Sequence, residues 1–256
     1  MAARDFDPSA VAAAIGRQLL IGEEETAELD LFSALGRNED CPVCLEPMPL
    51  YYDDRILCHI CGNMTCSPCV VKMRRTFSRK LCSVCNTDHA KSQAIFDKTF
   101  KKGVLRLSER RNPDAAIQVG RHYRAGRDGF ILNPALSLHY YLQAAKMGCS
   151  EGYCDLGDAY GYGVENIVDK DLDRCVRCLE VAAKKGSAAA HKRLWELHYN
   201  LDIGSNREKA IKHARVLAEA GCSASTKYLF DQLKEGRIPR DELDKILRVR
   251  QENTQS

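Results

Sequence analysis

The spacing of the cysteines constrains the fold of this chain more than any other feature of its sequence. Eight of its 13 cysteines lie between Cys41 and Cys85 and form four pairs, each with two intervening residues. The pairs are Cys41/Cys44, Cys58/Cys61, Cys66/Cys69 and Cys82/Cys85. A turn of this length directs two thiolates at one metal ion, so each pair can supply half of a tetrahedral site. The four pairs therefore predict two structural zinc ions (Zn2+) held entirely by cysteine.

The same eight cysteines could instead form four disulfide bonds, as they do in small secreted domains. The first 40 residues do not favour export, because they hold nine acidic and three basic side chains and Arg17 interrupts their only apolar run. No run of eighteen apolar residues predicts a membrane span. We therefore expect an intracellular protein, cytoplasmic or nuclear, in which this spacing indicates metal binding.

The four pairs follow one another with 2, 13, 2, 4, 2, 12 and 2 intervening residues. Ligand pairs in such a series could be wired in sequence or crosswise. The spacing and the opening Cys-Pro-Val-Cys resemble the all-cysteine variant of the RING finger, whose first and third pairs bind one zinc and whose second and fourth bind the other. The resemblance implies one ion held by Cys41, Cys44, Cys66 and Cys69, and another held by Cys58, Cys61, Cys82 and Cys85.

The resemblance also implies a function. RING ubiquitin ligases grip a ubiquitin-conjugating enzyme with the residue between the first two ligands and with a large apolar residue of a short helix, and Val43 and Met73 occupy these positions. Many ligases carry an arginine after the eighth ligand, where this chain has Asn86, and a proline after the seventh, where it has Ser83. We expect a ubiquitin ligase or ligase component without a catalytic nucleophile; the alternative is a non-enzymatic interaction scaffold with structural zinc.

Two other interpretations of this region carry less weight. The FYVE finger also has four cross-wired pairs, but it surrounds its third cysteine with a cluster of arginine and histidine, where this chain has only Arg55 and His59. Residues 72–111 carry twelve Lys or Arg against three acids, which could meet nucleic acid, acidic lipid or an acidic protein. No aromatic ladder accompanies these charges, so a solvated face is preferred and nucleic acid is not expected. His59 and His89 are expected not to be ligands, because eight cysteines complete two tetrahedra.

The C-terminal half repeats itself with a period of 35–38 residues. Gly120-x-x-Tyr123-x-x-Gly126 recurs as Gly157-x-x-Tyr160-x-x-Gly163, and the units end in Ala-Ala-x-x-Gly or a close variant of it. These units resemble Sel1 repeats, which are relatives of the tetratricopeptide repeat. The resemblance implies stacked helical hairpins whose concave surface binds another protein. Cys175 and Cys178 fall at equivalent repeat positions and are predicted to be buried packing residues rather than a third metal pair.

The fold class predicted from these patterns is mainly α, with a small zinc module followed by an α-helical solenoid. An acidic segment over residues 1–40 contains a predicted helix with Val11, Ile15, Leu19 and Leu20 on one stripe, which could dock on either domain, and Glu23-Glu24-Glu25 ends it in solvent. The remaining boundaries are a zinc module over 41–86, a basic linker over 87–112 and repeats with a degenerate C-terminal cap over 113–256.

Overall fold

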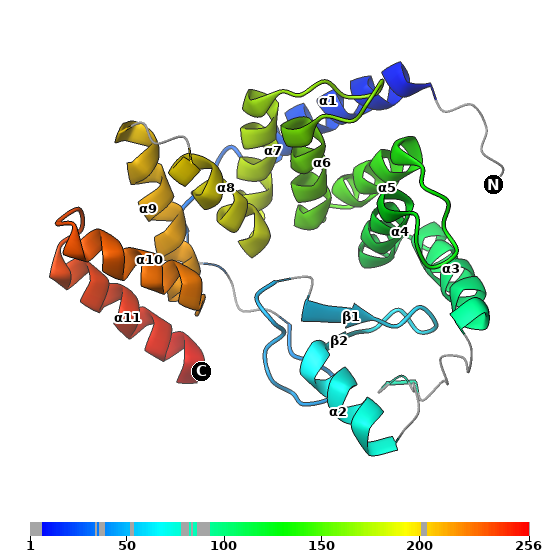
Figure 1. The fold of residues 1–256 in the computed structure, drawn as a ribbon, viewed down its shortest axis with the longest axis horizontal. Helices are drawn as coiled ribbons and strands as arrows, with labels where there is room; N and C mark the ends of the chain where they lie inside the picture. The colour runs from blue at the N-terminus through cyan, green and yellow to red at the C-terminus, as the bar shows by residue number, and fades with distance from the viewer. Residues whose placement is uncertain are drawn as a thin grey trace.

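The structure is a computed structural model of the chain, and it describes residues 7–33, 35, 39–51, 54–77, 82, 84–85, 93–200 and 204–255. The fold is mainly helical, as the sequence predicts (Figure 1). Among the described residues, no helix combines the length and the apolar character that crossing a membrane requires. The elements are α1 (Pro8–Glu25), β1 (Arg55–Leu57), β2 (Met64–Cys66), α2 (Ser67–Phe77), α3 (Gln93–Glu109), α4 (Pro113–Ala125), α5 (Pro134–Lys146), α6 (Ser150–Tyr162), α7 (Leu172–Lys184), α8 (Ala188–Asn200), α9 (Gly204–Glu219), α10 (Ser223–Lys234) and α11 (Arg240–Gln255).

Local sequence sets the bounds of the repeat helices. The side chains of Asn112, Asn133 and Asp171 accept backbone N–H bonds at the starts of α4, α5 and α7, where helical N–H groups have no intrahelical partner. Helix α4 ends at Ala125, and the next residue, Gly126, adopts the left-handed conformation with φ of 62°, which glycine enters without steric cost. These start and stop signals limit α4, α5 and α7 to 13 residues each.

Small residues let the helices pack closely, both within a hairpin and between neighbouring hairpins. A Cβ on Gly120 of α4 would lie 2.5 Å from the ring of Tyr141 in α5, and one on Gly152 of α6 would lie 2.6 Å from the backbone of Ala145. The main hydrophobic core runs along this row and includes Tyr141, Leu156 and Leu179. Glycines of the repeat pattern therefore set the spacing of the helices, because any side chain there would push them apart.

Helix α1 packs on the second helices of the hairpins, against α5 and α7, on the outer side of the curved row (Figure 1). Val11, Ile15 and Leu19 are buried there, as the stripe predicted, whereas Leu20 is 60% exposed and that part of the prediction is wrong. The acidic run ends the helix but does not simply face solvent. Glu23 receives two hydrogen bonds from Arg177, at 2.5 and 2.7 Å, and Glu25 lies 2.8 Å from Lys185.

The cysteine-containing module that is predicted to bind zinc, called the zinc module below, lies on the other side of the row, inside the arc formed by α3 to α11 (Figure 1). Its two strands form an antiparallel hairpin in which Arg55 pairs with Cys66 and Leu57 with Met64. Residues 93–109, inside the segment interpreted as a basic linker, form helix α3, which packs against α4. Leu57 joins Val104 of α3 and Val119 of α4 in a second core cluster. The module and the first repeat therefore share a hydrophobic core.

Candidate metal centres and the cleft beside them

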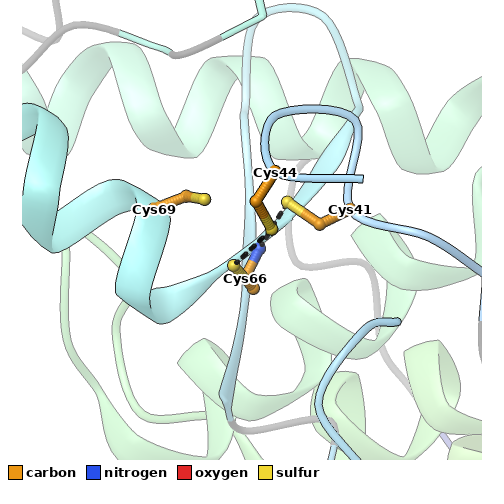
Figure 2. A group of neighbouring side chains, drawn as sticks. All are labelled: Cys41, Cys44, Cys66 and Cys69. Atoms are coloured by element: carbon orange, nitrogen blue, oxygen red, sulfur yellow. Dashed lines mark hydrogen bonds between the residues drawn. The ribbon is translucent and has the colours of Figure 1, made fainter. Parts of the chain in front are cut away.

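The first group of sulfurs comes from Cys41, Cys44, Cys66 and Cys69, whose Sγ atoms all lie within 4.8 Å of one another (Figure 2). The Cys41–Cys44 turn is closed by a hydrogen bond from the Leu45 amide to the Cys41 carbonyl, 2.9 Å long. Cys66 ends β2 and Cys69 follows in the first turn of α2, so this junction presents the other two sulfurs. The distance between the Sγ atoms of Cys44 and Cys66 is 3.8 Å. A tetrahedral zinc ion with Zn–S bonds of about 2.3 Å requires sulfurs about 3.8 Å apart.

The second group is formed by Cys58, Cys61, Cys82 and Cys85, again with all four Sγ atoms within 4.8 Å. The Sγ distances are 3.9 Å between Cys58 and Cys85 and 4.0 Å between Cys61 and Cys82. These distances also fit a tetrahedral thiolate site. They are about twice the S–S length of a disulfide bond, and all thirteen cysteines of the chain are free. Both groups therefore have the dimensions of metal sites.

The β hairpin determines which pairs meet. Cys58 follows β1 at the turn of the hairpin, while Cys66 ends β2 opposite Arg55 at the other end. Three strand residues separate these ends by roughly 10 Å, so the second and third pairs cannot share one ion. The amide of Cys66 lies 3.5 Å from Cys41 Sγ, which places the first pair beside the third, and the fourth pair joins the second. This crosswise grouping is the one that the RING resemblance implies. The stretch of chain between the two pairs of one site carries a cysteine pair of the other site.

Backbone and side-chain N–H groups surround the sulfurs. The amide of Cys66 donates to Cys41 Sγ at 3.5 Å, the amides of Val84 and Cys85 donate to Cys82 Sγ at 3.4 Å, and the Asn63 side chain donates to Cys61 Sγ at 3.3 Å. Such donors stabilise thiolate ligands and fix their orientation. A donor set of four thiolates suits zinc, and the residues present therefore fit the ion that the sequence predicts.

The thiols differ in how readily they ionise. Burial opposes ionisation of Cys41, but the amides of Cys66, Cys44 and Val43 outweigh it and lower the pKa of this thiol to about 6. Burial instead raises the pKa of the Cys58, Cys66, Cys69 and Cys82 thiols. A divalent cation at the centre would hold all four sulfurs of a site as thiolates, so metal binding releases protons.

The residues predicted to contact a partner have different positions. Val43 lies between the first two cysteines and is partly buried against the first sulfur group. Met73 lies one helical turn beyond Cys69 on α2, also partly buried, and therefore on the same face of the helix as that cysteine. Asn86, Ser83 and His89 lie outside the described residues. His59 is buried against the ring of Phe100, at a centroid distance of 5.3 Å, and belongs to neither sulfur group.

Sequence patterns did not reveal how the module docks on α3. The carbonyl of Ile60 accepts a hydrogen bond from Arg106 at 3.1 Å, and a Cβ on Gly103 would overlap the carbonyl of His59. The turn that carries Cys58 and Cys61 is thus held against the helix by its backbone. The only signal in the sequence is a glycine inside a helical segment, which often marks a close approach.

A cleft of about 380 Å³ lies between the module and the inner side of the repeats. Its walls come from the segment before β1, from α4, from the first turn of α6 and from α8. The lining residues are Tyr51, Asp54, Arg121, Glu151, Ala189, Lys192, Arg193 and Glu196. Cavities of this size fall in the range of ligand-binding pockets. The cleft is therefore a second candidate site besides the sulfur groups.

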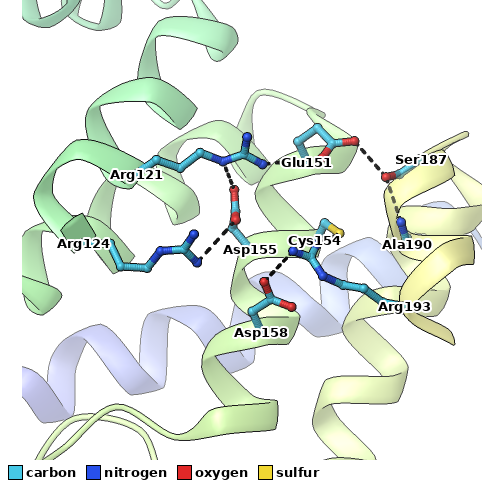
Figure 3. A network of polar contacts seen from close by, with 9 residues as sticks. All are labelled: Arg121, Arg124, Glu151, Cys154, Asp155, Asp158, Ser187, Ala190 and Arg193. Carbon is cyan, nitrogen blue, oxygen red and sulfur yellow. Dashed lines mark hydrogen bonds and ion pairs between the residues drawn. The ribbon is translucent and has the colours of Figure 1, made fainter. Parts of the chain in front are cut away.

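Charged side chains of three successive repeats form a network behind this cleft (Figure 3). Arg121 of α4 lies 3.1 Å from Asp155 of α6, and Arg193 of α8 lies 2.7 Å from Asp158. Arg193 also donates to the Sγ of the buried Cys154 at 2.7 Å. Burial raises the pKa of Asp158 to about 6 in spite of Arg193. The network ties the first helices of neighbouring hairpins together, since each arginine spans from one repeat to the next.

The comparisons with known proteins concern the helical half. The model of the Sel1 repeat matches residues 113–149, 150–187 and 196–222. The first two segments coincide with the hairpins α4–α5 and α6–α7, and the third ends just after α9. The chain therefore contains Sel1 repeats, as predicted. No curated protein gave a match.

Two solved structures resemble this part of the chain. One is the crystal structure of a Sel1 repeat protein from Oxalobacter formigenes, with 25% identity and a TM-score of 0.50. The alignment covers 61% of this chain and 64% of that one, which is less than two thirds of its length. The other is c5321, a protective antigen present in uropathogenic Escherichia coli strains displaying an SLR fold. Its identity is 20% and its TM-score 0.49, over 62% of this chain and 37% of that one.

Proposed function

We propose that this chain is a two-zinc, RING-type interaction protein. Its Sel1 repeats would hold a protein partner, while the zinc module would dock a ubiquitin-conjugating enzyme. The observation that carries the proposal is the crosswise grouping of the eight cysteines into two sets with metal-site dimensions. Ordinary packing does not require eight cysteines to converge in this way, and the module has little hydrophobic core of its own. Two zinc ions would supply the free energy that folds it.

The surroundings of the first site support an enzyme-docking surface. Val43 and Met73 flank this site from the loop and from α2, and neither is fully buried. Leu45 and Val71 lie beside them in the chain and are 75% and 44% exposed. Apolar side chains of this kind, presented on a zinc-fixed frame, suit recognition of another protein. The second site faces α3 instead. The first ion would therefore support the docking surface, and the second would hold the turn that packs on α3.

The chain would act by positioning rather than by covalent chemistry. A RING module holds the conjugating enzyme so that its ubiquitin thioester meets the amine of a bound partner in a reactive geometry. Such proximity and orientation can lower a barrier by about 7–11 kcal/mol in favourable cases. The repeats would raise the local concentration of the amine by holding the protein that carries it.

A second candidate function is a non-enzymatic scaffold in which zinc only shapes a binding surface. The observation that favours it is Asn86, which stands where many ligases have an arginine bridging the conjugating enzyme and ubiquitin. Asparagine is shorter and uncharged, so it cannot supply the same forked set of donors. The substitution Asn86→Arg distinguishes the two candidates.

Autoubiquitination with a panel of conjugating enzymes tests the proposal. We expect transfer by the zinc-loaded chain, a loss of at least tenfold for Met73→Ala, and a gain for Asn86→Arg. Ile131→Ala serves as the matched control, because Ile131 is 81% exposed on the α4–α5 connection, outside the module. Folded two-zinc protein that transfers no ubiquitin, with or without Asn86→Arg, would exclude the ligase and leave the scaffold.

A further inference from the structure

We infer that the segment carrying Tyr51 and Asp54 is a resident ligand of the repeat cleft, and that the partner segment this cleft binds presents a tyrosine and an acidic side chain. Here the repeat cleft means the surface formed by Arg121, Glu151, Lys192, Arg193 and Cys222. The inference rests on the proposed function only in assigning partner binding to the repeats. It identifies the chemistry of that partner from the segment that already occupies the site.

Tyr51 is the anchor of the resident segment. Its hydroxyl donates a hydrogen bond to Cys222 Sγ at 3.3 Å, and the Lys192 ammonium lies 5.5 Å from the centroid of its ring. Lys192 belongs to α8 and Cys222 precedes α10. A tyrosine from the zinc module therefore reaches the third and fourth hairpins, and burial together with the Cys222 contact raises the pKa of its phenol.

Asp54 supplies the acidic part of the same motif. It lines the cleft together with Arg121, Lys192 and Arg193, three cations from α4 and α8. Arg121 and Arg193 already pair with carboxylates of α6, at 3.1 and 2.7 Å. The ammonium of Lys192 instead lies over the Tyr51 ring. An acidic side chain in this cleft is therefore matched in charge by Lys192 first, and by the two arginines at longer range.

The resident segment leaves part of the cleft unused. About 380 Å³ of space remains beside Tyr51 and Asp54. Glu151 lines this space with only 9% of its surface exposed, and its Oε1 accepts a hydrogen bond from Ser187 at 2.8 Å. Its Oε2 accepts no hydrogen bond from the described residues and lies 3.8 Å from Arg121. A buried acceptor of this kind needs a donor. Because Oε2 is buried, the Glu151 side chain must turn toward the cleft before a backbone N–H of a longer bound peptide can donate to it.

The network of Arg121, Asp155, Asp158 and Arg193 has a simpler role, since it joins successive repeats. That role does not explain why a tyrosine of a different domain reaches this surface. It also leaves open why, among the described residues, a buried carboxylate oxygen at the cleft accepts no hydrogen bond. A peptide-binding cleft occupied in part by its own chain explains both observations.

Self-occupancy sets a threshold for any partner. A tethered segment acts at an effective concentration in the millimolar range. A partner present at about 1 μM must therefore bind roughly a thousandfold better than the isolated resident segment to displace it. The unused space and the Glu151 acceptor are where additional contacts could be made. The resident segment would thus exclude weak ligands and admit a partner that combines the tyrosine and acidic contacts with a longer backbone.

Fluorescence anisotropy with a labelled peptide of residues 47–57 tests the inference on the full, zinc-loaded chain. Tyr51→Ala empties the anchor position, so we expect it to bind the peptide at least tenfold more tightly than the wild-type chain does. A peptide with alanine at positions 51 and 54 should not bind either protein. Adding Lys192→Glu to Tyr51→Ala should weaken binding at least tenfold. Tyr162→Ala is the matched control, since Tyr162 is 86% exposed outside the cleft, and should behave as wild type.

Zinc content and circular dichroism establish that each variant is folded. Equal binding by wild type and Tyr51→Ala, or no binding by either of them, would overturn the inference. Ubiquitin transfer is a separate readout. A chain that transfers ubiquitin but shows no gain of peptide binding in Tyr51→Ala would contradict this inference and leave the proposed function intact.

Discussion

At the scale of single residues, Gly103 decides how closely the zinc module approaches α3. Glycine inside a helix usually costs about 0.5–1 kcal/mol relative to alanine. Its retention in α3 is explained by the carbonyl of His59, which a Cβ would overlap. The backbone of the module and the backbone of the helix are therefore in direct contact, and no larger residue fits between them.

Substitution of Gly103 by alanine should destabilise the chain by about 1–3 kcal/mol, as overpacking of a close contact does. Gly16→Ala is the matched control, since Gly16 also lies within a helix but has open space around its Cβ position. That change should stabilise the chain by about 0.5–1 kcal/mol. Urea unfolding of both variants measures the difference. Equal effects of the two substitutions would contradict the docking of the module on α3.

Three buried histidines of α8 and α9 form another residue-scale feature. The Nδ1 atoms of His191 and His213 are 3.0 Å apart, so one of the two rings donates to the other, and the His198 ring stacks on His213. Burial lowers the pKa of His191 to about 4, and burial together with the neighbouring histidines lowers the pKa of His213 to about 3. Lys209 faces the same group. The rings are therefore neutral in the folded chain at neutral pH.

These shifts predict how stability depends on pH. Above about pH 6.5 the histidines are neutral in the folded and the unfolded chain and have no effect. As the pH falls below about 6.5 the unfolded chain binds protons first, so stability is lost until the pH passes the folded-state pKa values of about 4 and about 3. The loss should be about 1 kcal/mol per histidine between about pH 6.5 and 5.5.

The urea midpoint of wild type and His213→Asn over this pH range measures the effect. Zinc loss at lower pH would act on both proteins alike, so the difference in slope isolates the histidine. An identical slope for both proteins would contradict the neutral, buried state of His213.

At the scale of elements, the sequence pattern of α1 predicts which face of the helix is buried but not which helices it packs on. The spacing of Val11, Ile15 and Leu19 correctly identified the buried stripe, because a helix buries residues at intervals of three and four. Leu20 lies one residue beyond the stripe and is exposed. The helix it packs on could not be predicted, because Arg177 and Tyr153, which contact Glu23 and Gln18, lie far away in the chain.

Truncation of a stripe residue should therefore have a large effect on this element. Ile15→Ala is expected to lower the free energy of unfolding by about 2–4 kcal/mol, because Ile15 is 1% exposed in the main core. Leu20→Ala should change it by less than about 0.5 kcal/mol. Denaturant titration of the two variants gives the comparison. A large effect of Leu20→Ala would mean that α1 packs by a different face.

For the sulfur sites, too, the sequence predicts the residues involved but not, from spacing alone, how they are grouped. The residue types and their spacing sufficed to predict which eight cysteines gather into two groups of metal-site dimensions, because a pair with two intervening residues is a local feature. Spacing alone left sequential and crosswise wiring open, and the RING resemblance chose between them. In the structure, the hairpin keeps Cys58 and Cys66 at opposite ends, and the loop of the first pair lies at the Cys66 end, where the Cys66 amide donates to Cys41 Sγ.

At the scale of the whole molecule, the zinc module and the repeats form one body rather than two. The sequence predicted a concave face that is open to a partner. In the structure, Tyr51 and Asp54 lie at this face and Leu57 enters the core of the first repeat. Periodicity could not reveal this arrangement, because the contacts are made by backbone carbonyls of the module and by single side chains such as Tyr51, not by a repeating pattern.

This shared core predicts how loss of metal would spread. Chelation should increase amide hydrogen exchange in α3 and α4 first, because Val104 and Val119 pack on Leu57. Helices α10 and α11 form a separate cluster around Leu229 and Leu243 and should keep their protection. Mass-spectrometric exchange on the chelated and the zinc-loaded chain measures both regions. Unchanged exchange in α3 and α4 would contradict a core shared with the module.

The account depends most directly on the number of metal ions. Elemental analysis of the purified full chain, expressed without added metal and exchanged into metal-free buffer, gives this number. We predict two zinc ions per chain, and one in a chain that carries the substitutions Cys44→Ser and Cys69→Ser, since only the first site would be lost. One or no zinc in the wild-type chain would contradict the cross-braced module on which the proposed function rests.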